Sequence, residues 1–105
     1  MIHHLVHCVL RDEVDQATVE DLVRWSRALL LKIPEVLNVR SGRNLDPESP
    51  WQFFYSIEVD SLEKLKITLD DPFYLKLLDR YVNPAIKECM VMNYELDPSR
   101  DLKYS

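Results

Sequence analysis

The chain is 105 residues long, with 47% hydrophobic and 30% charged residues, a composition typical of one soluble globular domain. It carries 13 Lys and Arg against 18 Asp and Glu, a net charge of −5, which argues against nucleic acid and anionic membranes as partners. Its single glycine excludes a glycine-rich phosphate loop. We see no leader and no apolar run near the roughly 18 residues of a membrane span, so we expect a cytoplasmic protein.

The first stretch, Ile2–Leu10, predicts a strand with apolar residues and histidine on both faces. One face carries Ile2, His4, Val6, Cys8 and Leu10, and the other carries His3, Leu5, His7 and Val9. Because a strand that is apolar on both faces is covered on both sides, we expect this strand to lie centrally in a sheet.

The next segment shows helical periodicity up to about Ile33. Asp15 and Thr18 are both candidate N-caps, and Pro34 ends the helix. Leu31 lies off the apolar stripe. That stripe consists of Val19, Leu22, Val23, Ser26, Leu30 and Ile33, widened by Trp25 and Leu29.

Two strands are predicted at 36–43 and 51–59, joined by a loop rich in Pro, Asp and Ser. Gly42 indicates a β-bulge in the first of them. The second has a strong apolar face formed by Trp51, Phe53, Tyr55, Ile57 and Val59.

Two short helices follow. Asp60 with Glu63 resembles a capping box for the first helix, whose inward residues are Leu62, Leu65 and Leu69. Asp71 caps the second helix, and Pro72 occupies its first position. The buried stripe of the second helix is predicted to be Tyr74, Leu75, Leu78, Tyr81 and Val82.

A last strand at 88–96 completes a domain at 1–97, followed by a polar tail at 98–105. The order β-α-β-β-α-α-β predicts an α+β, ferredoxin-like unit: a four-stranded antiparallel sheet with its helices on one face and the first strand beside the last. The other face would expose Leu5, Val9 and Phe54. An exposed apolar face of this kind favours a homodimer packed sheet to sheet.

Five short motifs, in this order and spacing, resemble the stress-responsive dimeric α/β barrel family over about residues 2–96. They are IHHLV at 2–6, KIPEVL at 32–37, SGRN at 41–44, DP at 71–72 and VMNYE at 91–95. The resemblance implies a homodimer whose two sheets form a barrel. The family includes plant stress-induced proteins and a polyketide cyclase, and more distant relatives include cofactor-free monooxygenases and isomerases.

The resemblance also implies a role for His4, which matches a catalytic histidine on the first strand of cyclase-type members. Those members carry a second histidine in a His-Pro-x-His motif. This chain departs from that motif, with Asp71 and Tyr74 at the two histidine positions. A tyrosine, with a reference pKa of about 10, accepts a proton poorly near neutral pH. Tyr74 would therefore orient a ligand or donate a hydrogen bond.

We expect a ligand pocket between the first strand and the helix at Pro72. Arg43 and Asn44 are expected to lie in a solvated loop, with a place at the pocket mouth as the alternative. Its candidate lining is His4, Val6, Cys8, Tyr55, Tyr74 and Leu78, with His4 and Tyr74 as candidate catalytic residues. The bulky side chains that could instead close it are Phe73, Leu78 and Met92. The alternative interpretation is a buried His4 whose nitrogens are satisfied by tyrosine hydroxyls.

The remaining histidines and the two cysteines give weaker indications of a functional site. His3 and His7 lie about 13 Å apart along one strand, too far to share a metal ion except across a dimer axis. His7 is expected to meet Glu58 at the interface, which would make dimer stability depend on pH. Cys8 and Cys89 lack zinc-site spacing and are expected to be buried, reduced thiols that face each other.

The leading hypothesis is a homodimer that binds a small apolar or aromatic ligand, with no cofactor. One alternative is a cofactor-independent enzyme of the cyclase, isomerase or monooxygenase type that uses His4 and Tyr74. The other alternative is a structural or interaction protein with no open pocket. A cavity of about 300 Å³ or more with His4 and Tyr74 both on its wall would favour the first two, and a filled interior would favour the third.

Overall fold

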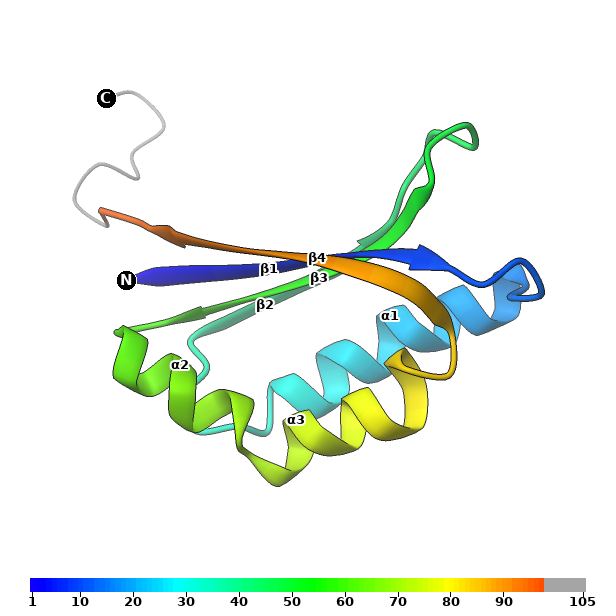
Figure 1. The fold of residues 1–105 in the computed structure, drawn as a ribbon. Coiled ribbons are helices and arrows are strands. Elements are labelled where there is room, and N and C mark those ends of the chain that lie inside the picture. The colour runs from blue at the N-terminus through cyan, green and yellow to red at the C-terminus, as the bar shows by residue number, and fades with distance from the viewer. Residues whose placement is uncertain (98–105) are drawn as a thin grey trace.

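The computed structural model describes residues 1–97, and the polar tail predicted at 98–105 lies outside the described residues. The elements are β1 (Ile2–Leu10), α1 (Gln16–Leu30), β2 (Asn38–Arg43), β3 (Trp51–Val59), α2 (Leu62–Leu69), α3 (Pro72–Leu77), the π-helix η1 (Leu78–Val82) and β4 (Ile86–Glu95). All the helices lie on one side of the sheet (Figure 1). None of the helices within this range is long and apolar enough to cross a membrane.

The sheet is antiparallel with strand order β2-β3-β1-β4, so β1 lies between β3 and β4, as predicted. One face of β1 is buried from Ile2 to Cys8, with Leu10 half-buried at its end, and the other face is half-buried. The apolar face of β3 packs toward the helices, where Phe53, Tyr55, Ile57 and Val59 are buried in the core. The ferredoxin-like α+β fold is thus confirmed.

The face of the sheet away from the helices, called here the bare face, is set by the strand registers. Its members on β1, β3 and β4 are His3, Leu5, His7, Val9, Phe54, Ser56, Glu58, Met90, Met92 and Tyr94. The outer part of the β2–β3 hairpin rises on this side, away from the helices (Figure 1). Within the described chain, nothing packs over the bare face as the helices pack over the other.

Strand β2 starts later than predicted and contains no bulge at Gly42. Its ladder with β3 runs without a register shift, and Gly42 stands directly opposite Phe54. A Cβ at Gly42 would lie 3.4 Å from the Phe54 ring, an ordinary van der Waals contact, so the packing here does not require a glycine. The irregularities of the sheet occur instead near the end of β1, on either side of Val9.

Two helix ends differ from the sequence prediction. Of the two candidate caps of α1, Asp15 is the one used, accepting a hydrogen bond from the Thr18 backbone N–H. Helix α1 ends at Leu30, and turns carry the chain on to Pro34. Helix α2 is capped by Ser61 rather than Asp60. Both residue types cap helices well, and the extended backbone at Ser61 decides between them.

The predicted buried stripe of the last helix is wrong in part, and the helix changes type after Leu77. Asp71 caps α3 and Pro72 opens it, as predicted, but the chain then widens into η1, where the Asn83 N–H donates to the Leu78 carbonyl over 2.8 Å. Leu77 is fully buried, whereas Leu75 is 50% exposed. Leu62 of α2, also predicted to point inward, is 66% exposed.

We predict that Leu77→Ala will lower the free energy of unfolding by about 2–5 kcal/mol, because it leaves a cavity in the core. Leu75→Ala, two residues away on the exposed side of α3, is the matched control and should change it by less than about 0.5 kcal/mol. Urea unfolding of both variants measures the difference. Equal losses, or a larger loss for Leu75→Ala, would contradict the burial of Leu77 and the exposure of Leu75.

Candidate functional site

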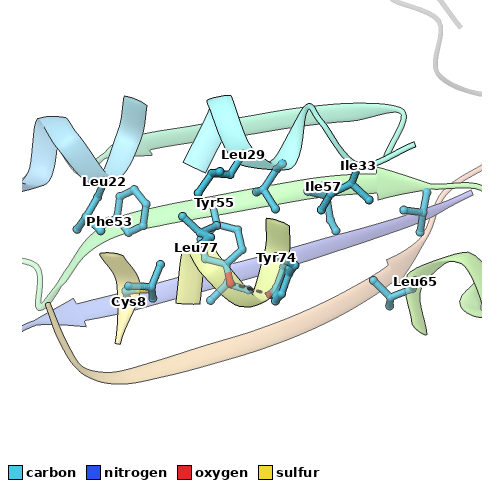
Figure 2. Packing of buried hydrophobic residues seen from close by; sticks show 14 of the residues in the cluster. Cys8, Leu22, Leu29, Ile33, Phe53, Tyr55, Ile57, Leu65, Tyr74 and Leu77 are labelled. Carbon is cyan, nitrogen blue, oxygen red and sulfur yellow. Dashed lines mark hydrogen bonds between the residues drawn. The ribbon is translucent and has the colours of Figure 1, made fainter. Parts of the chain in front are cut away.

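Two buried tyrosines from different layers meet beneath the sheet. Tyr55 extends from β3 and Tyr74 from the first turn of α3, and their hydroxyls lie 2.8 Å apart (Figure 2). Their rings meet edge to face at 6.3 Å. Burial, the main cause, raises the pKa of both hydroxyls. Both groups are therefore neutral near pH 7 and act as hydrogen-bond donors and acceptors rather than as bases.

A cavity of about 170 Å³ lies beside this tyrosine pair, between the sheet and the α3–η1 segment. It is lined by Val6, Tyr55, Tyr74, Leu78, Val82, Asn83, Ile86, Cys89 and Val91. The lining is mostly apolar and aromatic, with Asn83 as a polar member, and includes no charged side chain. The structure thus brings four of the predicted pocket residues together, namely Val6, Tyr55, Tyr74 and Leu78.

His4 and Cys8 are not among the lining residues of this cavity, so it does not meet the criterion of about 300 Å³ with His4 and Tyr74 both on the wall. His4 is buried, and its Nδ1 lies 2.5 Å from Oδ1 of Asn93, its direct neighbour across the β1–β4 ladder. Since an amide oxygen only accepts, Nδ1 carries the proton and donates it. Burial, the largest cause, lowers the pKa of His4, so the ring is neutral near pH 7.

Asn93 was not among the predicted site residues. The alternation of β4 was the available signal, because it places Asn93 on the same side as Cys89. The register of the β1–β4 ladder, which sets Asn93 opposite His4, could not be predicted from the sequence. Of the three side chains considered as closing the pocket, only Leu78 lines the cavity. Met92 lies on the bare face, and the Phe73 ring lies 5.4 Å from the Lys32 ammonium.

The histidines of the bare face have other neighbours than expected. The predicted His7–Glu58 pair is wrong, because the register sets Glu58 opposite His3 and Phe54 opposite His7. The His7 ring instead stacks on Phe54 at 6.1 Å. His3 Nε2 is buried and has no hydrogen-bond partner in the described chain. Among residues 1–97, no cluster of three or more potential metal-ligating side chains is present.

A second, larger hollow of about 480 Å³ lies between the end of β1, the start of α1 and the β2–β3 hairpin. Arg43 and Asn44 line this hollow and are not part of the tyrosine cavity. Its two carboxylates are already engaged, because Asp12 pairs with Lys87 at 2.7 Å and Asp15 caps α1.

The chain is similar to a known protein family in sequence and to solved structures in fold. Residues 2–96 match the family described as Stress responsive A/B Barrel Domain. A dimeric ferredoxin-like protein of unknown function from Bacteroides fragilis superimposes with a TM-score of 0.79 and 21% identity, over 90% of this chain and 95% of that chain. A Dabb family protein from Mesorhizobium loti superimposes with a TM-score of 0.75 and 20% identity, over 90% of this chain and 95% of that chain.

A structure of hydroxynitrile lyase from Passiflora edulis is also similar, with a TM-score of 0.77 and 18% identity over 92% of this chain and 94% of that chain. No curated protein matches the sequence. Because the family match spans nearly the whole described domain, the chain belongs to the stress-responsive α/β barrel family. Structural similarity at these identities shows the fold, and the fold alone does not determine the activity.

The lowered pKa of His4 predicts a pH dependence of stability. The unfolded chain binds a proton at His4 near pH 6.5, whereas the folded chain resists it. The contribution of neutral His4 to the free energy of unfolding is therefore fully present above about pH 6.5. It is lost as the pH falls toward the pKa of His4 in the folded state. Between pH 7 and 5, the unfolding free energy of the wild type should fall more steeply than that of His4→Gln. Parallel pH profiles from urea unfolding would contradict this.

Proposed function

We propose that this protein is a homodimer that binds a small, neutral, apolar or aromatic molecule in the tyrosine cavity of each subunit. The observation that carries the proposal is the cavity of about 170 Å³ with Tyr55 and Tyr74 on its wall. Buried tyrosine hydroxyls that bond mainly to each other can reorient toward a polar group of a ligand.

The size and chemistry of the cavity indicate a ligand built on a single ring. An apolar protein cavity of about 150 Å³ accommodates benzene. The cavity is smaller than the roughly 300 Å³ at which drug-sized pockets begin, so a multi-ring polyketide would not fit without movement of the walls. The absence of charged lining residues disfavours carboxylates, because a buried anion would have no countercharge.

The bare face supports the homodimer. It presents Leu5, Val9, Phe54 and Met92 half-buried, with Met90 exposed, on one continuous side of three paired strands. Burying apolar surface of this kind is worth about 25 cal/mol per Å². A second copy packed sheet to sheet would cover this surface, and the Bacteroides fragilis neighbour is described as dimeric. The cavity lies on the opposite side of the sheet and would remain accessible.

A cofactor-independent enzyme is the second candidate. It is supported by the neutral His4, whose Nε2 would keep a lone pair for proton abstraction, and by the hydroxynitrile lyase with the same fold. Binding is favoured over catalysis because His4 does not line the cavity and both tyrosine pKa values are raised.

The cytoplasmic location of the protein remains a prediction from composition.

Titration of the isotope-labelled protein with toluene, phenol and benzoate, followed by amide chemical shifts, tests the proposal. Toluene and phenol should give saturable shifts at the cavity residues, and benzoate should bind at least about tenfold more weakly because its charge is not compensated. Val91→Phe should weaken toluene binding at least about tenfold by filling the cavity. Ile67→Phe, on the exposed part of α2, is the matched control and should bind normally.

Absence of saturable shifts in the wild type, or unchanged toluene binding in Val91→Phe, would remove the proposal. The first outcome would favour the alternative of a structural protein with no open pocket. Turnover of any compound found to bind, abolished by His4→Ala, would instead establish the enzyme alternative.

A further inference from the structure

The two cysteines of the chain stand directly opposite each other on neighbouring strands. Cys8 on β1 and Cys89 on β4 are register partners, so their side chains point to the same side of the sheet. That side faces the helices, because Cys8 is fully buried in the core there (Figure 2). Both thiols are free.

The hydrogen-bond pattern of this ladder shows which kind of pair they form. Met1 and Leu96 exchange both backbone hydrogen bonds, at 2.7 and 3.4 Å, and so form a hydrogen-bonded pair. Hydrogen-bonded and non-hydrogen-bonded pairs alternate along an antiparallel ladder. The register from there to Cys8 has no shift. Since Cys8 lies an odd number of residues beyond Met1, Cys8 and Cys89 form a non-hydrogen-bonded pair.

A non-hydrogen-bonded pair is compatible with a cross-strand disulfide. Its Cα atoms lie about 4.5 Å apart, with the side chains closer than in the other kind of pair. A disulfide spans Cα separations of about 4.4–6.8 Å. The strands therefore hold the two sulfurs close enough for a bond that needs side-chain rotation rather than backbone movement.

The two thiols differ in access to solvent. Cys89 is exposed and forms part of the tyrosine cavity wall, where small solutes can reach it. Cys8 is shielded, and burial, with a smaller contribution from Cys89, raises its pKa to about 12. Because the thiolate is the reactive form of cysteine, oxidation starts at Cys89 and Cys8 reacts only with a neighbour already in place.

We propose that Cys89 is an oxidation site whose product is captured by Cys8 as an intramolecular disulfide across β1 and β4. The oxidant is hydrogen peroxide. The Cys89 sulfur attacks one peroxide oxygen, the O–O bond breaks, and a sulfenic acid and one water form. The Cys8 sulfur then attacks the Cys89 sulfur, the S–O bond breaks, and the hydroxyl leaves as a second water with the Cys8 thiol proton.

A sheet-to-sheet homodimer is compatible with this reaction. Cys89 points toward the helix side, whereas the neighbouring Met90 lies on the bare face. A second copy packed on the bare face therefore leaves Cys89 accessible and keeps the Cys89 residues of the two subunits apart. The reaction within one chain is then favoured over a bridge between chains.

Treatment of the full-length chain with hydrogen peroxide, followed by mass spectrometry without reduction, tests the proposal. The wild type should lose the mass of two hydrogens and give a linked peptide pair containing Cys8 and Cys89. Cys8→Ser should accumulate a Cys89 sulfenic acid that dimedone traps. In Cys89→Ser, thiol oxidation should be at least about tenfold slower, because the remaining thiol is buried.

Three results would overturn the proposal: Cys89 oxidised to sulfinic acid while Cys8 remains a free thiol, disulfides found only between chains, or equal thiol oxidation rates in Cys8→Ser and Cys89→Ser. Wild-type circular dichroism before and after oxidation controls for unfolding, which would expose Cys8 and produce the bond without the native geometry.

Discussion

The pairing of β1 with both of its neighbours is the constraint on which the rest of this structure depends. Each residue of this strand has a partner on β3, on β4 or on both. A slip of one residue would move every side chain of the strand to the other face of the sheet. The same register sets His4 against Asn93, Cys8 against Cys89 and Val6 beside Tyr55.

The second determinant is the short helical segment that packs against this sheet. Asp71 and Pro72 fix where α3 begins, and its first turn delivers the Tyr74 hydroxyl to Tyr55. Leu77 at the end of α3 and Val82 at the end of η1 both face the core. The cavity occupies the space between this segment and the strands β1, β3 and β4. Its apolar and uncharged walls follow from the alternation of those strands.

Much of the fold could be predicted from local patterns. The strict alternation from Trp51 to Val59 and the Asp71-Pro72 signal each define one element, and both are confirmed. The order of the elements then restricts the topology to few arrangements. Features that depend on packing could not be obtained in this way. The π-helix at 78–82 has no sequence signature, and Asp60 and Ser61 are equally good caps by residue type.

The sequence predicted part of the cavity lining but not its arrangement. Tyr55 and Tyr74 were expected to lie together and they do, because an alternating strand and a capped helix fix which way each points. His4 was expected to join them, yet its partner is Asn93 on the opposite strand. The expected burial of Cys89 is wrong because β4 is an edge strand that the helices do not fully cover. The register between strands and the extent to which helices cover a strand depend on tertiary packing. The residue pattern of a single strand therefore does not predict them.

The central claim is that a second copy of the chain covers the bare face of the sheet, while the helix side of each subunit contains the tyrosine cavity. Sedimentation equilibrium of the wild type, Leu5→Glu and Leu31→Glu measures this most directly. Leu5 lies on the bare face, whereas Leu31 is an exposed leucine at the end of α1. We expect the wild type and Leu31→Glu to have twice the 12.5 kDa chain mass. Leu5→Glu should dissociate at least about tenfold more readily, because it buries an unpaired charge. A monomeric wild type, or equal dissociation constants for all three proteins, would contradict the account.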